Sequence, residues 1–208
     1  MNIDIQKQLW QLYQHSSYHI KWYIRVRVMI AQFQYVLSNV PQKGTILDVG
    51  CGYGVLSNLI SISYPNVHVI GIDTDANRIA VAQSTIGSRK NIQFKLADAS
   101  TLDAYGTVDA VIFFDVLHHI PCNLQQNSIN KALSSLKPNG TIIIKEINTY
   151  PKWQYLVNLF HDKALNGGPL CYRSNDEWKK LLQKENIMCQ TMEYGLIYPH
   201  VLLYGNKK

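Results

Sequence analysis

Cysteine is scarce in this chain, and the few cysteines lie far apart. No CxxC pair occurs among Cys51, Cys122, Cys171 and Cys189, so their spacing predicts neither a zinc site nor a disulfide framework and fits a reducing compartment. Apolar runs are short as well, and none approaches the roughly 18–20 residues that span a bilayer. The amino-terminal residues also lack the basic segment and apolar run of a signal peptide. We therefore expect a cytoplasmic protein without a metal centre.

Charged residues are few, at 16% of the 208 residues, whereas 47% are hydrophobic. This composition is typical of a globular chain rather than a disordered one, and the length suits one domain. The formal net charge of +6 is a mild basic excess that specifies no anionic partner. The sequence contains no internal repeat, low-complexity segment or dedicated RNA-binding appendage, so we expect no nucleic-acid partner.

Short apolar runs alternate with helical segments through the middle of the chain. Strands are expected at Thr45–Val49, Val67–Ile72, Ile92–Leu96, Val108–Phe114 and Thr141–Ile144, and helices at Val55–Ser63, Asn77–Ser88 and Cys122–Leu136. Strands that are apolar on both faces are typical of a parallel sheet covered on each side. The alternation predicts an α/β fold with a doubly wound sheet. A segment without glycine, from Ile3 to about Val40, is expected to be helical and to precede the sheet.

The alternation ends after the fifth expected strand. Residues 148–173 form an insertion rich in aromatic side chains, with a helix expected from Trp153 to about Leu165. Met188–Tyr194 and Val201–Gly205 are expected to form a final antiparallel pair, because their connection is too short for a crossover helix. We divide the single domain (1–208) into an N-terminal helical cap (1–40), a cofactor-binding core (45–147), a lid insertion (148–173) and a last helix with the strand pair (174–208).

A glycine-rich turn follows the first expected strand, in the segment Ile46-Leu-Asp-Val-Gly-Cys-Gly-Tyr-Gly54. Glycines there permit a tight turn and close approach of a ligand to the backbone, and the following helix offers free N–H groups. Asp48, before the first glycine, can face a cationic ligand or orient the loop. The spacing G-x-G-x-G departs from the G-x-G-x-x-G/A dinucleotide fingerprint, because Val55 occupies its last position.

The second expected strand ends in an acidic residue, Asp73, 23 positions after Gly50. A carboxylate at that place can accept both hydroxyl hydrogens of a ribose. The third expected strand is followed by Asp98, where an adenine amino group needs an acceptor. Each feature alone also fits an ordinary turn or strand-end cap, but their combination at this spacing indicates an adenosyl ligand.

These segments resemble the motifs of the class I S-adenosylmethionine-dependent methyltransferases. ILDVGCGYG is similar to the first motif of that family, VIGIDTD to the second, LADAS to the third, VDAVIFFDVLHHIP to the fourth, and LKPNG with TIIIKE to the turn and fifth strand. The resemblance covers about Thr45 to Glu146 and implies a Rossmann-like, seven-stranded, mostly parallel sheet with an antiparallel last strand. The LHH segment resembles the menaquinone- and ubiquinone-type enzymes, which methylate small molecules. The Asp/Asn-Pro-Pro-Tyr/Phe tetrad of enzymes that methylate nucleic-acid bases is replaced by Asp115-Val-Leu-His118.

The resemblance implies S-adenosyl-L-methionine as the cofactor and a set of residues that hold it. This set comprises Asp48, Gly50, Gly52, Gly54, Asp73, Thr74, Asp98, Ala99, Phe114 and Asp115. The glycines would cradle the methionine part, and Asp73 would hold the ribose hydroxyls. The adenine would lie against residues 74, 98 and 99, and the transferable methyl group near Phe114 and Asp115.

Candidate catalytic residues follow the fourth and fifth expected strands, where a doubly wound sheet binds its ligands. Methyl transfer is an in-line displacement in which the protein positions the nucleophile and removes its proton. His118, His119 and Glu146 lie near the expected methyl group, and a histidine can act as a base near neutral pH. Each could instead serve the structure of its loop. Asp162 with His161 is a further candidate pair, although charged pairs on helices are usually solvated.

Aromatic residues of the insertion and of the helix after it allow two interpretations. Trp153, Tyr155, Phe160, Tyr172 and Trp178 provide large apolar area with some polar edges. They form either a lid over an aromatic or lipid-like acceptor or the packing of a small subdomain.

The N-terminal segment His19–Arg27 mixes basic and aromatic residues. We expect it either to cap the active site or to lie on a membrane surface as a peripheral contact. Arg25 or Arg27 could also reach the carboxylate of the cofactor, and spacing does not decide between them.

The leading hypothesis is methyl transfer from S-adenosylmethionine to a small-molecule acceptor that is apolar or lipid-like, with O-methylation favoured. Two alternatives stay open. One is an NAD(P)-linked oxidoreductase, which Val55 in the glycine motif disfavours. The other is a cofactor-binding regulator without catalysis.

Overall fold

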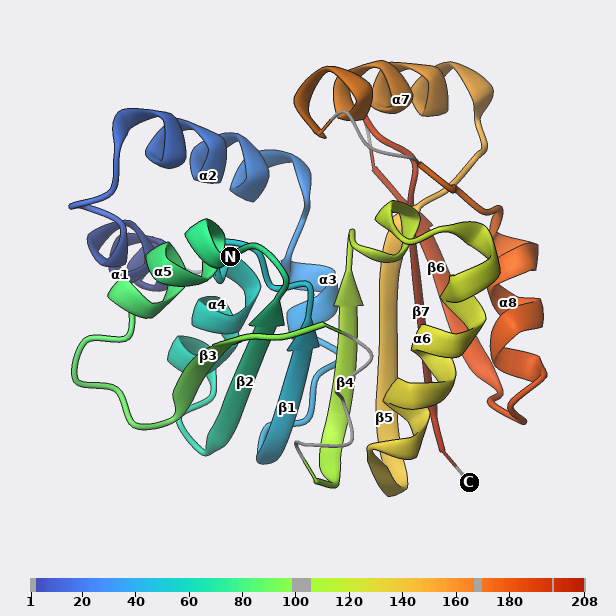
Figure 1. Ribbon diagram of the computed structural model, residues 1–208, viewed down its shortest axis with the longest axis horizontal. Coiled ribbons are helices and arrows are strands. Elements are labelled where there is room, and N and C mark those ends of the chain that lie inside the picture. The colour runs from blue at the N-terminus through green and yellow to red at the C-terminus, as the bar shows by residue number, and fades with distance from the viewer. Residues whose placement is uncertain (1–2, 99–105, 167–169, 196, 208) are drawn as a thin grey trace.

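The computed structural model describes residues 3–98, 106–166, 170–195 and 197–207 as one sheet surrounded by helices (Figure 1). The strands are β1 (Gly44–Val49), β2 (Val67–Asp73), β3 (Ile92–Leu96), β4 (Val108–Phe114), β5 (Leu136–Ile147), β6 (Cys189–Tyr194) and β7 (His200–Asn206). The helices are α1 (Ile3–Leu12), α2 (Tyr18–Ile30), α3 (Gln34–Leu37), α4 (Val55–Ser63), α5 (Ala76–Ser84), the 3₁₀ helix η2 (Leu117–His119), α6 (Cys122–Ser134), α7 (Lys152–Asn166) and α8 (Asn175–Gln183).

The sheet has seven strands in the order β3-β2-β1-β4-β5-β7-β6. Strands β1 to β5 pair with one another in parallel, whereas β7 is antiparallel to both β5 and β6. This confirms the predicted doubly wound, Rossmann-like sheet with an antiparallel last strand. The strand order reverses between β1 and β4, and such a switch point opens a crevice at the carboxyl ends of the strands.

Two hydrophobic cores cover the two faces of the sheet. Successive residues of β1 point to opposite faces, so Ile46 packs in one core and Leu47 in the other. The first core includes residues of α1, α4 and α5, and the second includes residues of α6 and α8. Trp178 of α8 is fully buried in the second core. Each buried leucine or isoleucine stabilises the fold by about 1.5–3 kcal/mol.

The predicted strands and helices of the core are present, with differences at their ends. Strand β5 begins at Leu136 rather than Thr141, because Leu136 pairs with Val108 across an irregularity in the ladder. The N-terminal helical segment is divided rather than continuous. Ser17 caps α2 by accepting a hydrogen bond from the Ile20 N–H, and Gln32 after α2 has a positive φ of 50°.

Helices α2 and α7 stand beyond the carboxyl ends of the strands, on either side of the crevice (Figure 1). The helix expected in the insertion is present as α7, and its position fits the predicted lid, although the division of the chain into cap, core and lid stays a prediction. Among the described residues, no helix is both long and apolar enough to cross a membrane.

Candidate functional site

A cavity of about 690 Å³ lies at the carboxyl ends of β1, β2 and β4, between α2 and α7. Its walls include most of the predicted cofactor residues and both histidines: Asp48, Gly50, Gly52, Asp73, Thr74, Asp98, Phe114, Asp115, His118 and His119. Gly54 and Glu146 are buried outside these walls. Ala99 lies outside the described residues. The structure thus brings most of the residues predicted for the cofactor, and both histidines predicted for catalysis, to one crevice.

The glycine turn after β1 has a backbone that other residues rarely adopt. Gly50 has a φ of +74°, and a Cβ there would collide with the side chain of Val116. Gly54 has a φ of +79° at the N-cap of α4, and a Cβ there would lie 2.6 Å from the ring of Phe94. Around Gly52, by contrast, a Cβ would meet nothing within 4 Å. The turn is therefore packed at both ends and open in the middle, where it forms part of the cavity wall.

Asp73 holds this turn from the end of β2. Its Oδ2 accepts a hydrogen bond of 2.8 Å from the Gly52 N–H, and its Oδ1 accepts one of 2.9 Å from the Asp75 N–H. An ionised carboxylate offers about four lone-pair sites. Each oxygen of Asp73 therefore keeps capacity for a further donor from the cavity, such as a ribose hydroxyl.

Asp48 is a buried carboxylate with a hydrogen bond at only one of its two oxygens. Its Oδ2 accepts a hydrogen bond of 2.5 Å from the Ser57 hydroxyl, whereas its buried Oδ1 has no hydrogen-bond partner in the described part of the chain. Burial raises the pKa of Asp48 to about 6, although the Ser57 bond lowers it. A cationic group in the cavity would compensate this carboxylate, so Asp48 fits a ligand that carries an ammonium or sulfonium charge.

Asp115 lies between two cations. Lys145, which is fully buried, donates to both of its oxygens at 2.6 and 2.7 Å, and Arg27 lies 2.9 Å from its Oδ2. Burial opposes ionisation of Asp115, but Lys145 and Arg27 outweigh it and hold its pKa well below the usual range. The Arg27 guanidinium also lies over the Phe114 ring, 5.3 Å from its centroid.

The structure separates the two arginines that the sequence left equivalent. Arg27 lines the cavity, whereas Arg25 is exposed on α2, 6.0 Å over the ring of Trp10. Of these two arginines, Arg27 is therefore the one placed to meet an anionic group of a ligand in the cavity.

His118, in the cavity wall, forms a buried pair with Glu146, which lies behind the wall. The His118 Nδ1 lies 2.5 Å from the Glu146 Oε2. The other oxygen of Glu146 accepts the N–H groups of Val116 and Leu117, at 3.0 and 2.6 Å. Glu146 therefore uses both oxygens on the segment that carries His118, and it orients the imidazole rather than lining the cavity.

Residues of the insertion complete the surroundings of His118. The Asp162 Oδ2 lies 3.6 Å from the His118 Nε2 and accepts hydrogen bonds from Asn158 and from the Tyr172 hydroxyl. The Tyr172 ring stacks on the His118 ring with centroids 5.0 Å apart. Asp162 was a predicted candidate, and the structure places it beside His118. The side chain of His161 is outside the described part.

The two histidines differ in their electrostatic surroundings. Burial lowers the pKa of His118, but the charge and hydrogen bond of Glu146, with Asp115 and Asp162, outweigh it and raise the pKa overall. Burial and the neighbouring His118 lower the pKa of His119 to about 4. The Glu146 contact therefore makes His118 the stronger base of the two.

The predicted lid aromatics divide into three groups. Tyr172 stacks on His118, and Tyr155 packs edge-on against Tyr172. Trp178 packs in the second hydrophobic core. Trp153 and Phe160 lie on the solvent side of α7, with 62% and 78% of their surface exposed. Trp178 therefore packs as the second interpretation expects, whereas a lid over an acceptor stays a prediction.

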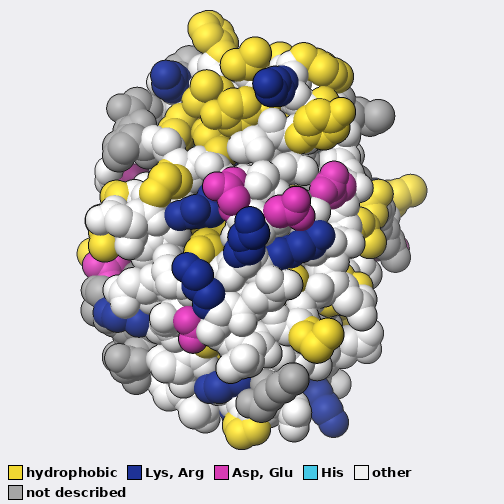
Figure 2. All heavy atoms as spheres, turned by 90° about the vertical axis from the view of Figure 1, so that its right-hand side faces the viewer, with side chains coloured by type: hydrophobic (Ala, Val, Ile, Leu, Met, Phe, Trp, Pro, Cys, Tyr) yellow, Lys and Arg dark blue, Asp and Glu magenta, His cyan; other side chains and the backbone are white. Residues whose placement is uncertain are grey.

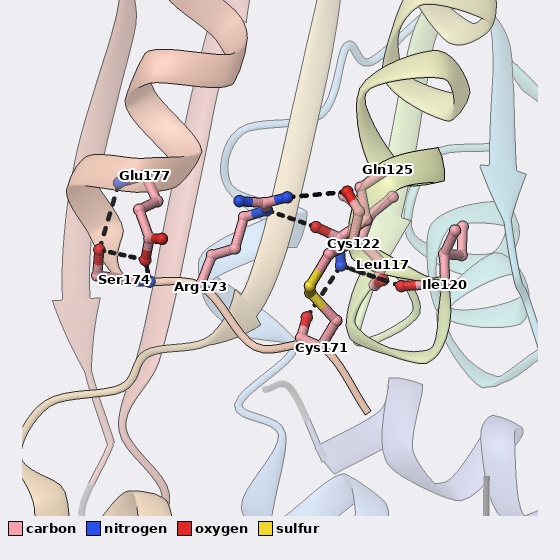
Figure 3. Close-up of a disulfide and its surroundings, with 8 residues drawn as sticks. All are labelled: Leu117, Ile120, Cys122, Gln125, Cys171, Arg173, Ser174 and Glu177. Carbon is pink, nitrogen blue, oxygen red and sulfur yellow. Dashed lines mark hydrogen bonds between the residues drawn. A yellow bond between two sulfur atoms is a disulfide. The ribbon is translucent and has the colours of Figure 1, made fainter. Parts of the chain in front are cut away.

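A disulfide joins Cys122, at the start of α6, to Cys171, near the end of the insertion (Figure 3). This corrects the expectation that the cysteines form no disulfide. Their separation of 49 residues carried no recognisable pattern, and only the fold brings their Cα atoms within 5.5 Å. Beside the disulfide, the Gln125 amide donates to the carbonyl groups of Leu117, Ile120 and Cys171. The disulfide therefore fixes the end of the insertion against the loop of His118.

Several site residues had no sequence prediction. These are Lys145 and Asn158 as polar partners, with Tyr198 and His200 in the cavity wall. Tyr172 is a predicted lid aromatic, but its hydrogen bond to Asp162 had no sequence signal. For Lys145 a signal existed, because a lysine in the otherwise apolar strand TIIIKE must find a counterion when buried. The contacts of Asn158 arise only when the insertion folds back over the sheet. The contact of His200 with the Ile30 carbonyl joins β7 to the end of α2, which is distant in sequence.

The fold and the site together define a Rossmann-like α/β protein. Its cavity lies where the strand order reverses and is lined by residues suited to an adenosyl ligand. The sequence profile of the family described as "Methyltransferase domain" matches residues 21–189. The chain therefore belongs to the methyltransferase domain family. This confirms the resemblance to class I methyltransferases and gives the oxidoreductase alternative no support.

Individual relatives agree with this family. The chain is 28% identical over 167 residues to a ubiquinone biosynthesis O-methyltransferase of Albidiferax ferrireducens, a match of 77% of this chain and 63% of that protein. The chain thus spans less than two thirds of this relative. In fold, it is similar to an O-methyltransferase family protein from Burkholderia thailandensis (TM-score 0.74, 18% identity, 94% and 61% covered). It is also similar to magnesium protoporphyrin IX methyltransferase from Synechocystis with bound SAH (TM-score 0.68, 19% identity, 100% and 95% covered).

Substitution of Glu146 by glutamine is expected to lower the pKa of His118, because it removes the neighbouring charge. The folded-state pKa of His118 is raised above its unfolded value of 6.5. This imidazolium therefore stabilises the fold fully below pH 6.5, and the contribution is lost as pH rises through the higher folded value. NMR titration of labelled histidine measures the change.

Two further variants control this titration. Asp162→Asn should lower the same pKa by less, because its oxygen lies farther from the ring, and it keeps the test valid if Glu146→Gln does not fold. Glu193→Gln, on the exposed edge strand β6, should leave the pKa of His118 unchanged. An equal pKa in wild type and both site variants would contradict the pairing.

The disulfide is expected to lower the number of reactive thiols and to raise the stability of the fold. Protein denatured without reductant should react at two cysteines, Cys51 and Cys189, and at four after reduction. Closing a 49-residue separation stabilises a fold by about 4 kcal/mol in the chain-entropy account. Cys171→Ser should therefore lower the urea midpoint, whereas Cys189→Ser, as a control, should change it little. Four reactive thiols before reduction would contradict the pairing.

Proposed function

We propose that this protein binds S-adenosylmethionine in the cavity and transfers its methyl group to a hydroxyl oxygen of a small, largely apolar acceptor. The observation that carries the proposal is the buried His118–Glu146 pair beside the glycine turn and Asp73. A base and an adenosyl-binding edge thus share one cavity. Family membership supports the reaction, and the name of the Albidiferax relative, an O-methyltransferase, supports oxygen as the acceptor atom.

The cofactor residues take the parts that their positions in the cavity allow. The remaining lone pairs of Asp73 accept the ribose hydroxyls, and Thr74, Asp98 and Ala99 border the adenine. The unpartnered oxygen of Asp48 compensates the positive charge of the methionine part, and Arg27 meets its carboxylate. The glycine turn approaches the cofactor with its backbone, and Phe114 and Asp115 border the methionine part from the end of β4.

His118 acts as the base. When bound, the cofactor supplies an electrophilic methyl group on a sulfonium. His118 takes the proton of the acceptor hydroxyl at Nε2, because its Nδ1 is engaged with Glu146. Glu146 keeps the imidazole in this orientation and stabilises the imidazolium that forms. Such proton removal is worth about 10²–10⁴-fold in rate.

The cavity favours an apolar acceptor. Its walls include the aliphatic side chains of Val26, Ile30, Ile120, Leu124 and Ile147. Ligand sites of this kind gain affinity from apolar surface and select their ligand with a few polar groups. Tyr198 and the two histidines are among the polar residues of the walls that can meet the hydroxyl to be methylated.

A binding and product assay separates the alternatives. Calorimetric titration should show binding of S-adenosylmethionine and not of NAD(H) or NADP(H). Incubation with methyl-labelled cofactor and a panel of hydroxylated aromatic and aliphatic compounds should give a product labelled on oxygen. Cofactor binding without any product would favour the regulator, and binding of a nicotinamide nucleotide alone would overturn the proposal.

Asp73→Ala is expected to weaken S-adenosylmethionine binding at least about 100-fold, because hydrogen bonds to a charged acceptor are each worth about 1.5–3 kcal/mol. Calorimetry measures the affinity, and thermal melting checks that the variant folds. The matched control is Asp109→Asn, a carboxylate at the opposite end of the sheet that pairs with Lys137. Near-normal affinity of the Asp73 variant would be incompatible with the site.

His118→Ala is expected to lower kcat by about 10²–10⁴-fold and to leave cofactor affinity nearly unchanged. His119→Ala should have a smaller effect, because its ring lacks the Glu146 contact. Glu146→Gln should move the acidic limb of the pH–rate profile to lower pH, because it lowers the pKa of the base. Unchanged turnover in both histidine variants would exclude His118 and His119 as bases.

A further inference from the structure

Helix α7 is amphipathic, but its apolar side faces solvent and its polar side faces the rest of the protein. Its apolar residues Trp153, Leu156, Val157 and Phe160 have the spacing i, i+3, i+4 and i+7 and form one stripe. This stripe faces solvent, with 62, 58, 47 and 78% of the respective side chains exposed. The opposite side is polar and faces the cavity: Gln154 and Asn158 are buried, and Asp162 lies beside His118. Packing against the described residues therefore does not explain the apolar stripe.

Helix α2, across the crevice, has a similar exposed side. Tyr18, Trp22, Arg25 and Met29 follow one another at spacings of three or four residues, and all four are exposed. The exposed fractions of Tyr18, Trp22 and Met29 are 75, 56 and 75%. Contiguous apolar surface of this kind marks an interaction site in soluble proteins.

The charged side chains on the outer sides of α2 and α7 are positive. Lys152 and Lys163 are exposed on α7, and Arg25 is exposed on α2. Helix α2 contains no acidic residue, and Asp162, the only one of α7, is engaged with Tyr172 and Asn158. Figure 2 shows hydrophobic side chains gathered at the α7 end of the molecule, with Lys or Arg side chains among them. The outer side is thus aromatic and cationic.

The position of these two helices links this surface to the cavity. Both stand beyond the carboxyl ends of the strands (Figure 1). Trp22, Val26 and Arg27 of α2 and Asn158 and Asp162 of α7 contribute to the cavity walls. A ligand that enters between the helices therefore passes the exposed aromatic side chains first.

We propose that the outer faces of α2 and α7 dock together on the surface of an anionic phospholipid bilayer. Aromatic side chains are suited to the interface between lipid and water, and cationic side chains are attracted to anionic headgroups. Docking turns the space between the helices toward the bilayer, so an apolar ligand can pass from lipid into the cavity. Docking itself does not depend on methyl transfer, so it can be tested without a substrate.

Vesicle co-sedimentation of the full chain tests the proposal. Binding is expected to vesicles of phosphatidylcholine with phosphatidylglycerol, to weaken with added salt, and to be at least tenfold weaker with phosphatidylcholine alone. The double variant Leu156→Ser/Phe160→Ser should lower the partition coefficient at least tenfold and leave the melting temperature unchanged, because both side chains are exposed. Lys152→Glu/Lys163→Glu should reduce binding to anionic vesicles only.

A matched control is Met188→Ser, because Met188 is 79% exposed and precedes β6 at the end of the sheet away from the cavity. This variant should bind vesicles as the wild type does. Tryptophan fluorescence adds a positional test. Brominated lipid should quench the wild type, and Trp153→Tyr and Trp22→Tyr should each reduce the quenching, since Trp178 is buried in the core.

Three results would overturn the proposal. One is absence of binding to anionic vesicles. Another is equal loss of binding in Met188→Ser and in the α7 variant. The third is a concentration-dependent dimer, seen by sedimentation velocity without lipid and abolished by Leu156→Ser/Phe160→Ser, because the stripe would then be covered by a second copy of the chain.

Discussion

The buried carboxylate of Glu146 is the interaction on which the site depends. It accepts the N–H groups of Val116 and Leu117 with one oxygen and contacts the His118 ring with the other. A buried charge is costly unless its oxygens are engaged, so this carboxylate holds the chain after β4 in one conformation. Parallel pairing of β4 with β5 provides the geometry, because it places Phe114 beside Lys145 and the next residues of each strand side by side.

The other carboxylates at this edge of the sheet are compensated in different ways. Asp115 has two cations, Lys145 and Arg27, whereas Asp73 has two backbone N–H groups. Asp48 has one hydroxyl donor and an oxygen without a partner among the described residues. Capacity for a ligand therefore remains at Asp48 and Asp73, at the side of the glycine turn. The proposed division between a cofactor side and a base side follows from this difference.

The insertion serves two surfaces at once. Its polar side, with Asn158 and Asp162, meets Tyr172 and His118, and its apolar side faces outward. The disulfide between Cys122 and Cys171 ties the end of this segment to the loop of His118. Asn158 and Asp162 beside the base and the outward apolar stripe are therefore parts of one helix, which connects the proposed chemistry with the proposed membrane surface.

The sequence alone determined the order of strands and helices, the glycine turn and the acidic strand ends, because these features depend on residues close together in the chain. It also placed His118 and Glu146 at the same sheet edge, since parallel strands end together. Only the tertiary structure distinguished His118 from His119 and Arg27 from Arg25, paired Cys122 with Cys171, and brought Lys145 and Tyr172 into the site. Some of these contacts join residues that are distant in sequence. Others distinguish neighbouring residues of the same type by the direction of their side chains. A sequence pattern contains neither the spatial distance between residues nor the direction of a side chain.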